Sequence, residues 1–190
     1  MMQSPEVAGL LDFWFSKEAC DRWFNSTPEF DETLRQQYMD CWRQGRDGLL
    51  QDWEQGPDGA LALVILLDQF PLNMFRDQPE SFSTEAQSRT VASRAIESGF
   101  DAALPDDRKA FLYLPFMHSE TLADQDRCVE LFAAAGLDFN LRWARGHREI
   151  VRRFGRFPHR NVILGRTSSA EELEWLASPE GFNPYIYSVC

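Results

Sequence analysis

Basic side chains are concentrated near the C-terminal end of an otherwise acidic chain. Residues 142–166 hold eight of the seventeen arginines, two of the three histidines and one acidic residue, Glu149, whereas the net charge of the chain is −11. Arginine forms planar, bidentate pairs with carboxylates and phosphates. The segment therefore indicates a bound anion, a buried carboxylate partner or a surface for another protein. A genome rich in GC would give the same excess of arginine over lysine without any function.

Within this segment, Gly155 and Pro158 define a turn directly after a predicted helix. Four polar side chains project from the turn: Arg156, His159, Arg160 and Asn161. Donors fixed by glycine and proline can bind a carboxylate or a phosphate, and His159 adds a catalytic group that takes or gives a proton. We assign Arg166 to the same ligand-binding set. Alternatively, these arginines cap helix carbonyls and pair with Asp68 and Glu120, and no ligand is needed.

A second candidate lies at 111–120, where His118 and Glu120 interrupt an apolar run. On a continuous helix their side chains would point about 200° apart, so they converge only if the helix ends between them. A capping box of Thr121 and Asp124 predicts that end. His118 would then act as a general base, with Glu120 holding its tautomer. The alternative is a satisfied polar residue at a helix end.

A third candidate surrounds Asp68, which follows the most apolar stretch of the chain. We expect Pro71 to end this helix, which places Asp68 in the last turn, against the negative end of the helix dipole. A carboxylate there needs a cation or a donor, and Arg76 or an arginine of 142–166 is the expected partner. The predicted ligand-binding residues of this segment are Asp68, Gln69, Asn73 and Arg76. The alternative is a buried Asp–Arg pair that fixes a turn.

Helical periodicity extends over nearly the whole chain. The predicted helices cover residues 5–15, 27–42, 59–70, 84–99, 106–117, 121–136, 139–154 and 168–176. Pro115 is expected to kink or split its helix, and Ser168 with Glu171 to form a capping box. Only 162–164 is a candidate strand. We therefore predict an all-α fold of antiparallel helix pairs, packed as a bundle or a short irregular superhelix in one domain over 1–190, with a tail at 179–190.

Composition excludes several classes of function. The negative net charge argues against binding to nucleic acid or to an anionic membrane, and the longest apolar run, 60–67, is too short to span a bilayer. The four cysteines form no CxxC pair and lie at no zinc spacing, and the N-terminus carries no basic leader. We expect a cytoplasmic protein with free thiols, without a metal or a cofactor.

The motifs together resemble a bacterial family, the domain of unknown function numbered 924. They are "LDFWF" (11–15), "WF" (23–24), "FD" (30–31), "LALVILLDQFPLNMFR" (61–76), "FLYLPFMHSE" (111–120), "LADQ" (122–125) and "FGRFPHRNVILGR" (154–166). The resemblance covers about residues 7–182 and implies a fold similar to tetratricopeptide-repeat-like superhelices. It implies no activity. The family pattern usually has an arginine where this chain has Leu72, so one cation expected near Asp68 is missing.

Three hypotheses follow. The first is a polar pocket of arginine, histidine and carboxylate groups that binds a small anionic molecule, with acid–base hydrolysis as its possible chemistry. The second is a tetratricopeptide-like scaffold that binds a peptide or a protein without catalysis. The third is a purely structural network of buried arginine–carboxylate pairs.

Overall fold

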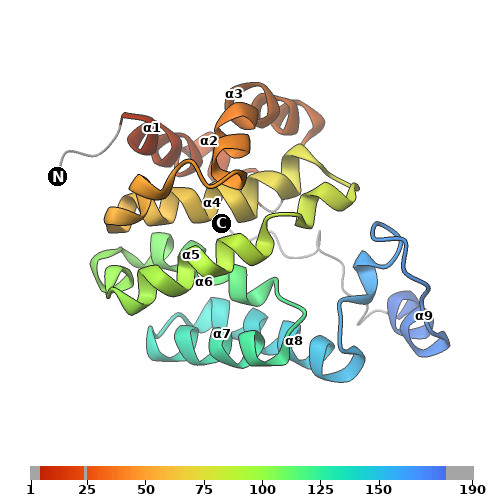
Figure 1. Ribbon diagram of the computed structural model, residues 1–190. Helices are drawn as coiled ribbons and strands as arrows, with labels where there is room; N and C mark the ends of the chain where they lie inside the picture. The colour runs from red at the N-terminus through yellow and green to blue at the C-terminus, as the bar shows by residue number, and fades with distance from the viewer. Residues whose placement is uncertain (1–4, 24, 179–190) are drawn as a thin grey trace.

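The computed structural model describes residues 5–23 and 25–178, and within these ranges the chain is all-α (Figure 1). The α-helices are α1 (Pro5–Trp14), α2 (Lys17–Cys20), α3 (Pro28–Arg46), α4 (Pro57–Met74), α5 (Glu85–Glu97), α6 (Asp106–Met117), α7 (Leu122–Ala134), α8 (Asp138–Phe154) and α9 (Ala170–Ala177). Short 3₁₀ helices are η1 (Gln51–Gln55), η2 (Pro79–Phe82), η3 (Phe100–Ala103) and η4 (Pro158–Arg160). The all-α prediction is confirmed, whereas the tetratricopeptide-like arrangement stays a prediction.

Helix α4 is the centre of the hydrophobic core. Every residue from Ala60 to Pro71 is buried, because this helix is apolar on all sides and therefore needs neighbours all round. It contacts α1, α3, α5 and α6, and Figure 1 shows it between the layer of α1–α3 and the pair α5 and α6. The prediction of a core helix at 59–70 is confirmed.

The prediction that Pro71 ends this helix is wrong, since α4 continues to Met74. Proline has no N–H, so the carbonyl of Leu67 loses its helical donor. The hydroxyl of Thr84, at the start of α5, donates to that carbonyl instead, at 2.5 Å. Asp68 therefore lies inside the helix and not in its last turn, and the helix dipole is not what determines its environment.

Helices α6, α7 and α8 follow one another through short turns. Consecutive helices joined in this way pack antiparallel, so α6 and α8 run in the same direction, and each contacts α7 and the other. Pro115 lies within α6, which is not split. The expected capping box at Thr121 is not formed; Ser119 Oγ accepts from the Thr121 N–H at 3.2 Å and donates to Asp124 at 2.6 Å.

The segment after α8 is a series of turns. Gly155 adopts φ 69°, the left-handed conformation that ends a helix readily when the residue is glycine. Residues 161–165 form a turn, so the strand considered at 162–164 is not formed. The capping box of α9 is made by Ser169 and Glu172, one residue later than expected. The predicted tail 179–190 lies outside the described residues.

Nothing in the described ranges meets the length and apolarity that a membrane-crossing helix needs.

Candidate functional site

His118 and Asp68 form a buried pair between the end of α6 and the middle of α4. His118 Nδ1 lies 3.0 Å from each carboxylate oxygen of Asp68. Since a carboxylate only accepts, Nδ1 carries the proton, and Nε2 is the nitrogen left for another partner. Gln69 Nε2 also donates to Asp68, at 2.5 Å, so the carboxylate is held from two sides.

The pair favours the charged form of His118. Burial alone lowers the pKa of the imidazole, but the charge and hydrogen bond of Asp68, together with the charge of Glu85, raise that pKa above its ordinary value of 6.5. Arg160 acts weakly in the opposite direction. His118 is therefore a basic group that is largely sealed from water, with 18% of its side chain exposed.

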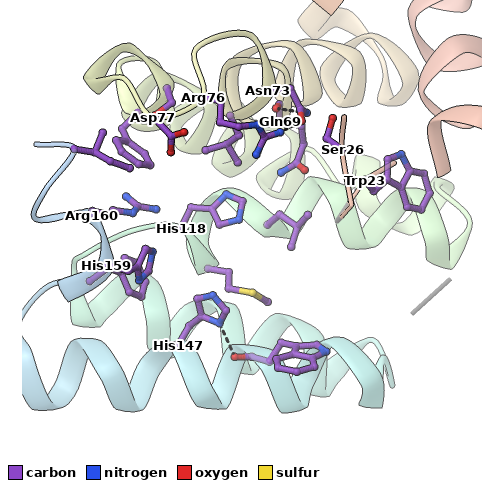
Figure 2. A pocket seen from close by; sticks show the side chains of 18 of the residues that line it. Trp23, Ser26, Gln69, Asn73, Arg76, Asp77, His118, His147, His159 and Arg160 are labelled. Atoms are coloured by element: carbon purple, nitrogen blue, oxygen red, sulfur yellow. Dashed lines mark hydrogen bonds between the residues drawn. The ribbon is translucent and has the colours of Figure 1, made fainter. Parts of the chain in front are cut away.

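His118 opens onto a cavity of about 320 Å³ (Figure 2). This volume lies at the lower end of the range for small-molecule sites. Figure 2 shows the His118 ring between α4 and α8, with Gln69, Asn73 and Arg76 above it and His147 below. The polar lining includes Ser26, Gln69, Asn73, Arg76, Asp77, Ser81, His118, Asn140, His147, His159 and Arg160. The apolar lining is Trp23, Leu72, Phe82, Leu114, Met117, Phe139, Trp143, Phe157 and Ile163.

The other two histidines also line this cavity, but both are held neutral. Burial lowers the pKa of His147 to about 4, and the nearby charges of His118 and Arg160 act in the same direction. The hydrogen bond between Nδ1 and the Trp143 carbonyl, at 2.9 Å, opposes this shift. Burial and then Arg160 lower the pKa of His159 to about 3. Among the three histidines, His118 alone has a pKa raised above the ordinary value, and the other two have lowered pKa values.

Three acid–base pairs surround the cavity with the same orientation. In each, the basic residue is part of the lining and the carboxylate is not. The pairs are His118 with Asp68, Arg76 with Asp31 and Arg160 with Glu85. All three carboxylates are buried behind their partners. The wall therefore presents cationic groups to the cavity, with one exposed acid, Asp77, which adopts a left-handed φ of 61°.

Arg160 is fixed by rings as well as by charge. Its guanidinium lies 4.4 Å from the ring centre of Phe82 and 4.8 Å from that of Phe157, and it contacts both Glu85 carboxylate oxygens at 3.0 and 3.1 Å. Burial raises the pKa of Glu85, against the opposing charges of Arg160 and His118. Such stacking fixes the orientation of the cation at the cavity wall.

The structure brings some of the predicted site residues together and separates others. Those lining the cavity are Gln69, Asn73, Arg76, His118, His159 and Arg160, with Asp68 directly behind His118. Those outside the lining are Glu120, Arg156, Asn161 and Arg166. The expected pairing of Asp68 with an arginine is wrong, because His118 and Gln69 are its partners and Arg76 pairs with Asp31.

Glu120 does not orient His118, contrary to the prediction. It accepts from the backbone N–H of Phe157 at 2.7 Å and from Arg166 at 2.7 and 2.9 Å. Arg156 pairs with Glu172, and the buried Asn161 amide donates to Ser168 and Glu172. For these four residues the geometry is that of a structural network, the alternative that the sequence left open.

Sequence reasoning missed several residues of the site. In the sequence, Glu85 is recognisable only as an acidic residue in the first turn of a helix, and Asp31 only as an acidic residue in an amphipathic helix. Neither pattern predicts a buried partner for a basic residue of the site. Gln125 was quoted only as part of the "LADQ" motif, yet its buried amide donates to the carbonyls of Met117 at 2.7 Å and Ser119 at 2.6 Å. It thereby holds the chain on both sides of His118.

No nucleophile is paired with His118 within 5–23 and 25–178. The two lining hydroxyls are used elsewhere: Ser26 donates to Asp31 at 2.6 Å and Ser81 to the Gln78 carbonyl at 2.7 Å. The same ranges contain no cluster of three or more His, Cys, Asp or Glu side chains with the arrangement of a metal site. A histidine whose Nδ1–H is held by a carboxylate has Nε2 as the nitrogen that can bind an anion or exchange a proton.

Comparison with known proteins assigns the chain to a family. Residues 10–180 match the family described as "Bacterial protein of unknown function (DUF924)". The chain belongs to this family. A solved structure of a protein of unknown function from Agrobacterium tumefaciens is 40% identical, with a TM-score of 0.86, over 90% of this chain and 97% of that one. No curated protein matches the chain. The resemblance drawn from the motifs is thus confirmed, and the DUF924 chain shares its fold with a solved relative.

Proposed function

We propose that the cavity binds a small organic anion, with His118 as the group that contacts the charged end. The observation that carries this proposal is the common orientation of the three acid–base pairs, in which His118, Arg76 and Arg160 line the cavity and their carboxylates are buried behind them. A wall of this kind attracts an anion while the total charge of the buried pairs stays balanced.

His118 can both bind the anion and exchange a proton with it. In the protonated imidazole, Nε2–H donates a charge-assisted bond to a carboxylate or phosphate oxygen, and Asp68 stabilises the positive charge through Nδ1–H. When a bound molecule carries an exchangeable proton, Nε2 of the neutral ring is the acceptor. This acid–base step needs no nucleophile from the chain.

The test is a titration of the protein with propionate and with inorganic phosphate, followed by calorimetry and by thermal shift at pH 6.5. His118→Asn keeps a donor for Asp68 and removes the cation at the cavity. We expect the anions to stabilise the wild type and to bind at least about tenfold more weakly to His118→Asn.

The matched control is Arg152→Gln, which removes an arginine whose partner, Glu149, is on an exposed helix face. Its affinity for the anions should equal that of the wild type. Equal anion binding by the wild type and His118→Asn, or no binding by either, would refute the proposal.

A further inference from the structure

We infer that the anion bound in this cavity carries an aromatic ring, so that the ligand is an aryl-alkanoate or a phosphorylated compound of the same shape. This inference rests on the proposed function, since it takes the charged end of the ligand to be at His118. The additional observation is that the lining has two different ends. His118, His159 and Arg160 lie at one, the basic end, where Phe82 and Phe157 flank Arg160, whereas Trp23 and Phe139 lie at the other, the aromatic end.

The positions of His147 and Phe139 along helix α8 show how far apart the two ends are. His147 lies at the basic end, because its ring packs 5.6 Å from that of Phe157, which in turn contacts His159 at 5.5 Å and Arg160 at 4.8 Å. Phe139 lies eight residues earlier on the same helix. At 1.5 Å per residue, Phe139 is therefore about 12 Å from His147 along the helix axis.

Helix α6 shows the same division on the other side of the cavity. The ring of Trp23 packs 4.6 Å from that of Phe111, which precedes His118 by seven residues, or about 10 Å of helix. Because α6 and α8 run in the same direction, Trp23 and Phe139 belong to one end of the cavity and His118 and His147 to the other. Figure 2 agrees, with Trp23 on the opposite side of the view from Arg160 and His159.

The aromatic end consists of rings that are already fixed in place. The Trp23 indole donates to the carbonyl of Trp14 at 3.0 Å, and its ring also makes an edge contact with Phe15 at 5.7 Å. Phe139 and Trp143 form an edge-to-face pair at 6.1 Å. Phe139 is 38% exposed although it is large and apolar. Preset rings of this kind favour a flat aromatic guest, which gains edge and face contacts in addition to buried area.

The two ends define the shape of the ligand. A single planar acid such as acetate fills only the His118 end, whereas a long flexible chain gains area but no ring contacts at the other. A phenyl ring joined to a carboxylate by two methylene groups extends from one end towards the other within a volume of about 320 Å³. The probe is therefore 3-phenylpropionate.

The experiment compares four ligands by calorimetry: 3-phenylpropionate, propionate, 3-phenylpropanamide and hexanoate. Comparing 3-phenylpropionate with propionate measures the contribution of the ring to affinity. Comparing it with 3-phenylpropanamide measures the contribution of the charge, and hexanoate tests whether an aliphatic chain can replace the ring. Trp23 and Trp143 line the cavity, so a change in tryptophan fluorescence reports occupancy of the aromatic end. Trp143→Leu removes one ring of that end, and Trp175→Phe is the control, since Trp175 packs against Phe154 outside the lining.

We expect 3-phenylpropionate to bind about tenfold or more tightly than propionate and hexanoate. Trp143→Leu should lose most of that advantage, so that its affinities for 3-phenylpropionate and propionate become similar, and Trp175→Phe should behave as the wild type with all four ligands. Equal affinity for 3-phenylpropionate and propionate, or tighter binding of hexanoate, would overturn the aromatic assignment and leave the anion site standing. Equal affinity for 3-phenylpropionate and its amide would overturn the anion site and, with it, this inference.

Discussion

At the scale of single residues, the partner of each histidine decides its charge. His118 and His147 line the same cavity, yet the carboxylate of Asp68 favours the imidazolium form of His118, whereas burial lowers the pKa of His147, whose Nδ1 bonds the Trp143 carbonyl. Burial alone would make both neutral. Of the three histidines in the lining, one is therefore basic and two are neutral.

The pH dependence of stability should have opposite signs at these two positions. Because the pKa of His147 is lowered to about 4, the unfolded chain binds a proton below pH 6.5 that the folded chain does not, and stability is lost as the pH falls. His147→Asn should remove this loss, worth about 2 kcal/mol between pH 7 and pH 5. The raised pKa of His118 gives stability that is full below pH 6.5 and lost as the pH rises.

Urea unfolding at pH 5, 6, 7 and 8 measures both effects. The unfolding free energy of the wild type relative to His147→Asn should fall towards pH 5, and relative to His118→Asn it should fall towards pH 8. Parallel curves for all three proteins would show that neither histidine is perturbed as described.

A second residue-scale prediction concerns Glu85, the carboxylate behind Arg160. Glu85→Gln removes its charge but leaves an acceptor for the guanidinium, so we expect a loss of roughly 2–3 kcal/mol in unfolding free energy, somewhat below that for a broken buried pair. The uncompensated Arg160 should also bind an anion several-fold more tightly. Calorimetry with propionate checks this, and Glu149→Gln, a change on an exposed face, should alter neither quantity.

The candidate site could be predicted from the sequence as a set of residue types but not as a set of contacts. His118 is predicted because it interrupts an apolar run, and His159 and Arg160 because they project from a turn fixed by glycine and proline; all three line the cavity. The partner of His118 was misassigned to Glu120, two residues away, when it is Asp68, fifty residues away. Such pairings depend on how the helices pack, which the local pattern does not contain.

At the scale of the elements, helix periodicity predicted the positions of most α-helices, whereas their ends depended on distant residues. Pro71 is a strong local stop signal, but one hydroxyl from Thr84 supplies the hydrogen bond that the proline removes. The end of α6 was expected from a local capping box, yet the side chain that satisfies its carbonyls is Gln125, from the next helix.

Gln125→Met tests the role of this amide at the end of α6. The substitution keeps the approximate volume and leaves the carbonyls of Met117 and Ser119 buried without this donor, so we expect a loss of about 1–3 kcal/mol in unfolding free energy. Because these carbonyls flank His118, its imidazole pKa, followed by NMR of the ring protons, should also shift. The control is Gln37→Met on the exposed face of α3, which should change neither.

At the scale of the whole molecule, the cavity is assembled from segments far apart in the sequence. Its walls come from α4, α6, α8, the turns around η2 and η4, and Trp23 and Ser26 between α2 and α3. The segment carrying η4 follows α8 and is bound to the connection between α6 and α7 by Glu120, which accepts from both the Phe157 N–H and Arg166. The pKa of Glu120 is lowered, since these bonds outweigh its partial burial.

Glu120 should therefore control the cavity without lining it. Glu120→Gln keeps the shape of the side chain but weakens the bonds to Phe157 and Arg166, so residues 156–166 should exchange their amide hydrogens faster, as measured by mass spectrometry. Affinity for propionate should fall several-fold, because ordering the wall that carries His159 and Arg160 then opposes binding. Glu171→Gln, which breaks only an exposed pair with Arg153, is the matched control. Unchanged exchange at 156–166 in Glu120→Gln would show that packing, rather than this carboxylate, holds the wall of the cavity in place.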